Sequence, residues 1–223
     1  MSGRRTLAVE AATYVASVAL LDGDFVLDHR LVAMRGATEE RLMPAIVDVL
    51  GQAGVRVDDL AAIACGSGPG SFTSLRIAAS LAKGLSVAGR VPLFAMSSLT
   101  LIVAAAESLA PGAYLAQLDA MRGDVYVQRV RVRADRTIVE DGRAELLTTT
   151  DAVALAARDG LVTVGGAGAS ISMVPDARGF AYAASLMREV DVATWEPEYG
   201  RMAEAQVQWE RRYGIPLQAK QDA

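Results

Sequence analysis

The run GSGPGSFTSLR, from Gly66 to Arg76, decides how the surrounding chain folds. It follows LAAIACG, from Leu60 to Gly66, which has the length and apolar composition of a buried strand. After it, the spacing of apolar residues predicts a helix over residues 71–88. Glycines permit the tight turn between the two, and Ser71 or Thr73 can bond the first free amides of the helix. A buried strand followed directly by a helix is typical of a parallel α/β unit.

A glycine loop at a helix N-terminus is also a potential anion site. This loop lacks the Gly-Lys-Ser/Thr ending of a phosphate-binding P-loop and does not match the GxGxxG dinucleotide fingerprint. A structural elbow is therefore the favoured interpretation, with phosphate binding as the alternative. The later glycines Gly165, Gly166 and Gly168 also lack the third glycine of the fingerprint, and we expect a plain turn there.

The regions beside this unit alternate between strand and helix patterns. Before it, the expected elements are strands at Arg5–Glu10, Tyr14–Leu21 and Phe25–Val32 and a helix over residues 38–53. After it, they are a strand at Val91–Ala95 and a helix that ends near residue 109. The order βββαβαβα predicts a mixed sheet with helices on its faces, because a parallel crossover needs a helix between strands.

Strand patterns restart after Pro111-Gly112 and repeat the βββαβ order in shortened form. The expected elements are strands at Tyr114–Asp119, Asp124–Arg133 and Thr137–Leu147, a weak helix at Asp151–Arg158 and a strand at Leu161–Val164. We therefore expect a first lobe at 1–109, a second lobe at 110–195 and a C-terminal segment at 196–223. This segment is expected to become helical over Met202–Arg212 and to dock on the body through Trp209 and Tyr213.

Composition excludes several classes of protein. The 223 residues include 52% hydrophobic residues, one Cys and one His, which excludes disordered and disulfide-stapled chains and a zinc site made of Cys and His alone. No run approaches the roughly 18 uninterrupted apolar residues that a membrane helix needs. We therefore expect a cytoplasmic protein without membrane contact. A net charge of −4 argues against a broad nucleic-acid-binding face.

Three arginines of one strand parity, Arg129, Arg131 and Arg133, form the densest group of cations on a predicted strand. They could bind phosphates as a modest basic strip, or they could form salt bridges with the next predicted strand. We expect salt bridges, so that any RNA binding by the isolated chain is weak. The acidic residues expected to pair with these arginines are Glu140, Asp141 and Glu145.

Few side chains have the pattern of a catalytic or metal site. Glu10 ends the first predicted strand, where an exposed strand-end carboxylate is favoured over a metal ligand or a base. Asp119 and Asp124 flank a turn, and they could bind a divalent cation or simply form the hairpin. His29 and Cys65 lie in apolar strand patterns, so we expect a half-buried and a buried packing residue. A catalytic triad is therefore not expected.

The helix predicted over residues 71–88 is apolar around nearly its whole circumference, with only Arg76 and Lys83 charged. Either it is enclosed in the core, or one stripe of it faces a partner. We predict that it shares an exposed stripe with the helix over residues 38–53 and that this stripe forms a helical bundle with a partner. The predicted interface residues are Leu42, Ile46, Phe72, Leu75, Ala78, Ala79, Ala82 and Leu85.

Together these runs resemble the TsaB family, the accessory subunits of the bacterial machinery that makes threonylcarbamoyladenosine in tRNA. The most specific run is GPGSFTSLRIAASLAKGL, from Gly68 to Leu85. The runs LAVEAATYVASVALLDGD, ERLMPAIVDVL and LDAMRGDVYVQRV are similar to the family's opening strands, first helix and start of the second lobe. WEPEY, from Trp195 to Tyr199, resembles the family's C-terminal EP-x-Y element. The resemblance covers most of the chain.

The resemblance implies an α/β fold with the two-lobed, actin-like and Hsp70-like ATPase architecture of the RNase H-like class. It implies a non-catalytic scaffold that binds and supports TsaD, the enzyme that transfers the threonylcarbamoyl group to the tRNA adenosine next to the anticodon. TsaE would join through the complex, and tRNA would be contacted only indirectly. A homodimer would form when TsaD is absent. No cofactor is implied.

The chain departs from the pattern of its relatives at several positions. TsaD holds a metal through histidines on a helix, and this chain has Thr38–Leu42 there, so we expect no metal site. The first strand ends in Glu10-Ala11-Ala12 instead of Asp-Thr-Ser, which argues further against phosphate binding. Met121-Arg122 stands in the order opposite to the usual one. The alternative function is an independent enzyme of the same fold, a small ATPase or a peptidase-like hydrolase.

Overall fold

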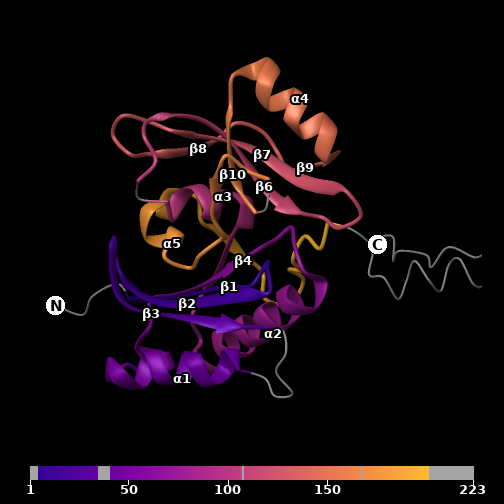
Figure 1. Ribbon diagram of the computed structural model, residues 1–223. Helices are drawn as coiled ribbons and strands as arrows, with labels where there is room; N and C mark the ends of the chain where they lie inside the picture. The colour runs from indigo at the N-terminus through magenta and orange to yellow at the C-terminus, as the bar shows by residue number, and fades with distance from the viewer. Residues whose placement is uncertain (1–4, 35–40, 107, 167, 201–223) are drawn as a thin grey trace, which may run out of the picture.

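The first of two mixed sheets is built from the N-terminal strands (Figure 1). The computed structural model describes residues 5–34, 41–106, 108–166 and 168–200. In spatial order the strands of this sheet are β12 (Arg188–Val190), β5 (Leu93–Met96), β4 (Ala62–Gly66), β1 (Arg5–Glu10), β2 (Val15–Asp22) and β3 (Phe25–Ala33). β1, β2 and β3 pair antiparallel, whereas β1, β4 and β5 run parallel. The three predicted N-terminal strands and the parallel unit are thereby confirmed.

Helices cover both faces of this first sheet. Its outer face carries α1 (Leu42–Gln52) and α2 (Phe72–Gly89), which lie below it in Figure 1. The side chains of β1 alternate, as a strand requires: Leu7 and Val9 pack in the core beneath α1 and α2, and Ala8 packs on the opposite side. On that opposite side lies α3 (Ser98–Ala104), between the two sheets.

The second sheet is formed by the middle of the chain. Its spatial order is β11 (Ile171–Ser172), β10 (Val162–Gly165), β6 (Gly112–Asp119), β7 (Asp124–Val132) and β8 (Ile138–Glu140), and β9 (Glu145–Thr148) also pairs with β7. The single strand expected over residues 137–147 is therefore wrong, because the chain turns at Asp141-Gly142 and pairs with β7 twice. Helix α4 (Thr149–Asp159) covers the outer face.

After the second sheet, the chain returns to the first. Short helix α5 (Gly179–Tyr182) contacts α3, and β12 then pairs antiparallel with β5. The change of sheet between β5 and β6 lies near the expected limit at residue 109. The expected second lobe at 110–195 needs correction at its far end, since β12 belongs to the first sheet. The division into lobes otherwise stays a prediction, and the expected helix and docking contacts of residues 202–213 lie outside the described residues.

Candidate partner interface and neighbouring cleft

The glycine loop between β4 and α2 uses its own amides to hold neighbouring segments. The amide of Ser67 donates to the Met96 carbonyl (2.8 Å) and that of Ser71 to the Ala12 carbonyl (2.7 Å). The Gly68 amide donates to the Ser98 hydroxyl (3.0 Å), and Pro69 has no amide hydrogen. Three amides of the loop are thus used to hold neighbouring segments in place. The geometry agrees with the expected structural elbow.

Glu10 is enclosed at the end of β1. Its exposed fraction is 0%, so the expectation of an exposed carboxylate is wrong. It has the same strand parity as Ala8 and therefore points toward α3. Its two carboxylate oxygens accept from the Ala12 amide (2.5 Å) and the Ser98 hydroxyl (2.8 Å). Burial raises the pKa of Glu10 to about 7, and the two hydrogen bonds offset this only in part.

Close packing around Glu10 explains one glycine of the loop. A Cβ atom added to Gly66 would lie 1.7 Å from a carboxylate oxygen of Glu10. Only glycine therefore permits the carboxylate to reach the Ser98 hydroxyl. The same packing leaves no route from solvent to this carboxylate, so Glu10 is not placed to bind a metal ion or a substrate.

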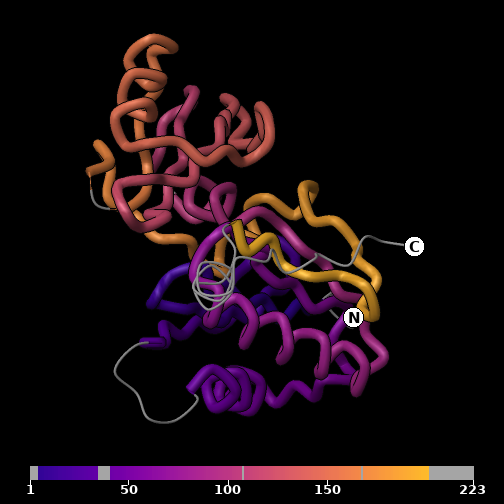
Figure 2. The backbone as a smooth tube through the Cα atoms, turned by 90° about the vertical axis from the view of Figure 1, so that its right-hand side faces the viewer, coloured from indigo at the N-terminus to yellow at the C-terminus, as the bar shows by residue number. Residues whose placement is uncertain are grey.

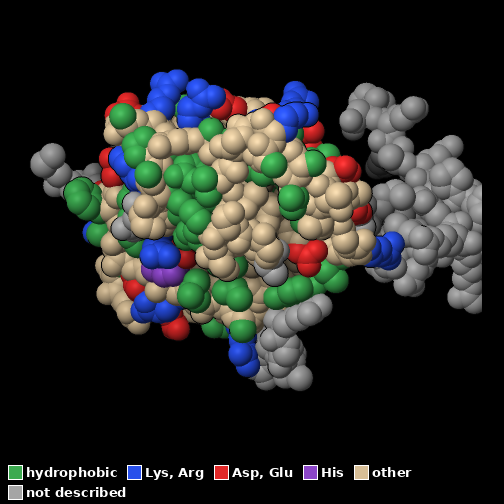
Figure 3. All heavy atoms as spheres, turned by 45° about the horizontal axis from the view of Figure 1, so that its top comes forward, with side chains coloured by type: hydrophobic (Ala, Val, Ile, Leu, Met, Phe, Trp, Pro, Cys, Tyr) green, Lys and Arg blue, Asp and Glu red, His purple; other side chains and the backbone are tan. Residues whose placement is uncertain are grey.

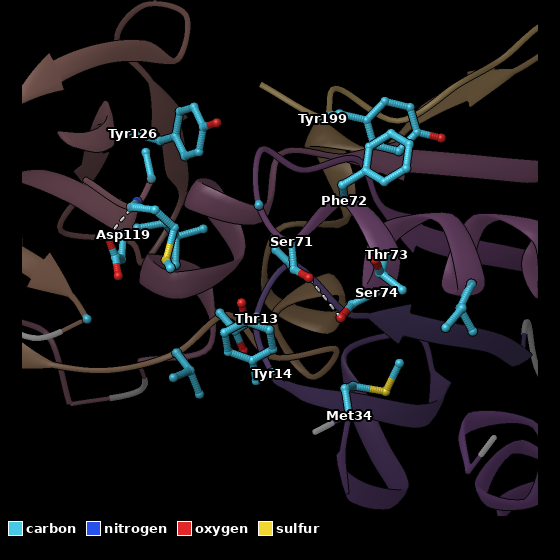
Figure 4. A pocket seen from close by; sticks show the side chains of 18 of the residues that line it. Thr13, Tyr14, Met34, Ser71, Phe72, Thr73, Ser74, Asp119, Tyr126 and Tyr199 are labelled. Atoms are coloured by element: carbon cyan, nitrogen blue, oxygen red, sulfur yellow. Dashed lines mark hydrogen bonds between the residues drawn. The ribbon is translucent and has the colours of Figure 1, made fainter. Parts of the chain in front are cut away.

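A cleft of about 740 Å³ lies between the two sheets, in front of the N-terminus of α2 (Figure 4). Phe72 and Tyr199 form one side of it, and Asp119 and Tyr126 lie across from them. Its described lining is mostly apolar, and Arg122 is the one cation among those residues. The polar part of this lining includes the hydroxyl groups of Thr13, Ser71, Thr73 and Ser74 beside Asp119 and Arg122.

Residues Trp195–Tyr199, here called the C-terminal strap, lie along α2; they are the yellow end of the described chain in Figure 2. The amide of Glu198 donates to the Ser67 carbonyl of the glycine loop (2.7 Å). The ring centroids of Tyr199 and Phe72 are 4.6 Å apart. The strap thus holds the loop and the first turn of α2 from the solvent side.

The strap is also tied to the middle of α2 by charge. Lys83 donates to a carboxylate oxygen of Glu196 (3.0 Å), and the Tyr199 hydroxyl donates to the other oxygen (2.9 Å). The Lys83 ammonium lies 5.8 Å from the Trp195 ring centroid. Hydrogen bonding to Lys83 lowers the pKa of Glu196. Sequence reasoning missed this contact, because the two segments are far apart in the chain.

Six of the eight residues predicted for the partner interface are enclosed by their own chain. Their exposed fractions lie between 0% and 3%. They are Leu42, Ile46, Leu75, Ala78, Ala79 and Ala82. The prediction is therefore wrong for these residues, since they pack on the first sheet. The remaining two, Phe72 and Leu85, are half-buried.

A different stripe of α2 is accessible. Thr73, Arg76 and Ser80 are exposed, and Ile77 and Leu81 are half-buried. Spacings of three and four residues place them on one side of the helix. We call these five residues the α2 outer face. They line a shallow depression of about 390 Å³ and carry a single charge.

The other candidate residues have structural partners. Asp119 accepts from the Met121 amide (2.7 Å), which fits a hairpin-forming acid. Cys65 is buried as expected, and burial raises the pKa of its thiol far above the usual range. His29 is half-buried as expected, with Nε2 3.1 Å from an Asp176 carboxylate oxygen. Burial would raise the pKa of Asp176, but hydrogen bonds from His29 and Arg178 lower it overall.

Two of the three arginines of the predicted basic strip, Arg129 and Arg131 on β7, are paired. Arg129 lies 2.8 Å from Asp159 and 3.9 Å from Glu145, and Arg131 lies 2.6 Å from Asp141. On the face seen in Figure 3, basic side chains lie beside acidic ones. The expected pairs with Asp141 and Glu145 are confirmed. The expected pairing of Glu140 is wrong, since Glu140 bonds Thr100 and Arg188 instead.

Two further predictions concern the glycines after β10 and the absence of a membrane helix. Met173 donates its amide to the Gly165 carbonyl where β10 ends, which fits the plain turn expected at the later glycines. Over the described ranges, no helix combines the length and the apolar character that crossing a bilayer requires.

Comparisons with known proteins agree with the fold. A family model described as "TsaD: tRNA N6-adenosine threonylcarbamoyltransferase" matches residues 34–170. The tRNA threonylcarbamoyladenosine biosynthesis protein TsaB of Bacillus subtilis is 28% identical, and the match covers 91% of this chain and 96% of that protein. The protein of the same name from Escherichia coli is 37% identical, but that match covers 55% of this chain and only 53% of the relative.

A solved structure supports the same assignment. YeaZ from Pseudomonas aeruginosa superposes with a TM-score of 0.70 at 25% identity, covering 86% of this chain and 98% of that one. The predicted α/β class with an actin-like architecture is confirmed. Because the family model spans more than half of the chain and both relatives described above are TsaB proteins, the chain belongs to the TsaD family of that model and, within it, to the TsaB proteins.

Proposed function

We propose that this chain takes part in making threonylcarbamoyladenosine in tRNA, as a non-catalytic subunit that binds and supports TsaD. Its TsaB relatives are named for this biosynthesis. The proposal locates the chain in the cytoplasm, with TsaE joining through the complex and tRNA contacted through TsaD. The arginines of β7 support the indirect contact with tRNA, since Arg129 and Arg131 each have a carboxylate partner within the chain.

The observation that carries the scaffold role is the α2 outer face. An accessible helix stripe with two large apolar residues, Ile77 and Leu81, and one charge suits a partner helix better than solvent. Val47 on α1, 54% exposed, adds an apolar side chain on the same outer side of the first sheet. The strap contacts α2 beside this face, at Phe72 and Lys83, so the face is presented on a fixed element.

Substituting Ser80 by Arg is expected to weaken binding to TsaD by about 30-fold or more, the loss of about 2 kcal/mol typical of a central interface position. Ser80 is exposed at the centre of the α2 outer face, so the monomer should keep its stability. Titration calorimetry with TsaD from the same cell measures the affinity, and complementation of a strain lacking this chain measures threonylcarbamoyladenosine in tRNA.

The matched control for this test is Ala154→Arg, which adds the same charge at an exposed position of α4 on the second sheet. It should leave both the affinity and the modification level unchanged. If Ser80→Arg bound TsaD as well as the control does, the α2 outer face would not be the interface.

The alternative function, hydrolysis of ATP or peptides by the chain itself, lacks a described site. The amides of Ser67, Gly68 and Ser71 in the glycine loop already have partners, and Glu10 is enclosed. We therefore expect the purified chain to release phosphate from ATP no faster than buffer does, with or without Mg²⁺. Turnover that survives purification and is lost in Arg122→Ala, with the fold intact by circular dichroism, would support an enzyme acting in the cleft instead.

A further inference from the structure

The cleft between the two sheets offers apolar surface to an occupant. Besides the aromatic rings described above, its lining includes Met34, Met121 and Met173. Val174, which also lines it, is 42% exposed. Its volume of about 740 Å³ is typical of a cavity that encloses a bound group. Because apolar surface is favourably removed from water, an apolar occupant would stabilise this cleft.

The described residues end at this cleft. Tyr199 packs on Phe72 on the α2 side, and Tyr126 lies on the opposite side (Figure 4). Gly200, the next residue, lies against Tyr126, since a Cβ atom added to Gly200 would be 2.5 Å from that ring. Its φ is +74°, which residues with a side chain rarely adopt. The chain therefore passes from one side of the cleft to the other between Tyr199 and Gly200, and a glycine permits this passage.

The sequence that follows Gly200 has the chemistry of an apolar occupant. It reads RMAEAQVQWERRYGIPLQAKQDA, from residue 201 to residue 223. Met202, Ala205, Trp209 and Tyr213 are separated by three, four and four residues. This spacing places them on one side of the helix that the sequence predicts over Met202–Arg212.

The other segments outside the described residues lack such a pattern. Residues 35–40, which continue from Met34 at the cleft, read RGATEE and contain no large apolar residue. Residues 1–4 read MSGR, with Met1 as their one large apolar residue. Position and composition together therefore favour the segment after Gly200.

We propose that the chain's own C-terminal segment occupies the cleft, with the apolar side of residues 202–213 turned inward. Trp209 and Tyr213 are the large side chains that enter it. The segment continues the C-terminal strap across the cleft and contacts both sheets, so any other molecule that binds there has to displace it. The surface is separate from the α2 outer face, and the proposal does not depend on TsaD.

Cysteine labelling of the full chain tests whether the cleft is covered. Val174→Cys places a thiol on the cleft lining, and Val162→Cys places one at the start of β10, outside the lining. Both valines are 42% exposed, which makes the second variant a matched control. Cys65 is buried, so it should not react. A segment docked by about 1.4 kcal/mol should slow labelling of Val174→Cys with N-ethylmaleimide about tenfold relative to the control.

Two changes within the segment identify the occupant. Adding Trp209→Glu to Val174→Cys places a charge on the apolar side of the segment and should raise the labelling rate to that of the control. Gln208→Glu adds the same charge one residue away but keeps Trp209, and it should leave labelling slow. Circular dichroism checks that each variant is folded.

Tryptophan emission observes the segment itself. The chain has two tryptophans, so Trp195→Phe leaves Trp209 as the single emitter. Its emission should lie at the short wavelengths typical of apolar surroundings. Val174→Glu, which adds a charge to the cleft, should shift this emission to longer wavelengths, and Val162→Glu should not.

Slow labelling that Trp209→Glu relieves, together with an emission shift in Val174→Glu alone, supports the proposal. It is overturned if Val174→Cys reacts as fast as Val162→Cys, if Trp209→Glu leaves the reaction slow, or if Trp209 emits as in water. Protection that appears only at high protein concentration would also overturn it, because the occupant would then come from another molecule.

Discussion

Replacing Ala82 by Arg is expected to unfold the chain rather than to block a partner. The Ala82 side chain is 0% exposed and packs in the core between α2 and the first sheet. An unpaired charge in such a place costs several kcal/mol, a large part of the roughly 5–15 kcal/mol that holds a typical domain together. Urea unfolding followed by circular dichroism should show a transition at much lower urea, or a chain that is not folded in buffer.

Ser80→Arg is the matched comparison, because it adds the same side chain two residues away on the exposed side of α2. Its unfolding midpoint should stay within the small range typical of surface changes. An Ala82→Arg chain as stable as the Ser80→Arg chain would mean that the inner stripe of α2 is accessible after all.

Stability is expected to fall as pH rises from about 4.5 to 7, because of Glu10. The folded chain raises the pKa of this carboxyl from 4.5 to about 7, mainly by burial. Between these two values the folded state holds a proton that the unfolded state has lost, so folding is favoured at the acidic end. At 1.36 kcal/mol for each pKa unit, the effect is at most about 3 kcal/mol. It is fully present below pH 4.5 and lost above pH 7.

Glu10→Gln tests this assignment, because the amide keeps the shape and an acceptor for the Ala12 amide but cannot ionise. The variant should gain stability relative to the unmodified chain as pH rises from 5 to 8, measured by urea unfolding at each pH. Taking the difference between the two proteins removes the effects of all other titrating groups. A difference that stays constant over this range would show that Glu10 does not titrate there.

Local patterns were enough for most of the first sheet. The strand pattern of RTLAVE predicted β1 with its observed bounds, and the strands predicted at Tyr14–Leu21 and Phe25–Val32 match β2 and β3. β12 could not be predicted, since three residues carry too little periodicity and owe their strand form to pairing with β5. The split of residues 137–147 into β8 and β9 was missed for a similar reason. The bounds of both strands depend on which residues of β7 pair with them.

The sequence predicted which helix carries the candidate interface, but it did not predict which side of that helix faces outward. The sequence showed that α2 is apolar all round, but the choice of the outward stripe depends on where the strap and the first sheet lie. That information is in long-range contacts such as Glu198 with Ser67. The burial of Glu10 follows from its parity, because Glu10 points to the same side of β1 as Ala8 and that strand is covered on both faces.

The return of the chain to the first sheet sets the order in which the molecule can be finished during translation. β12 and the strap come from residues 188–199, yet they close the free side of β5 and secure the glycine loop near residue 67. Until those last segments leave the ribosome, the nascent first sheet has an open edge at β5. The first sheet is therefore completed only after the second sheet has been synthesised. In the meantime, a nascent-chain chaperone would bind at the open edge of β5.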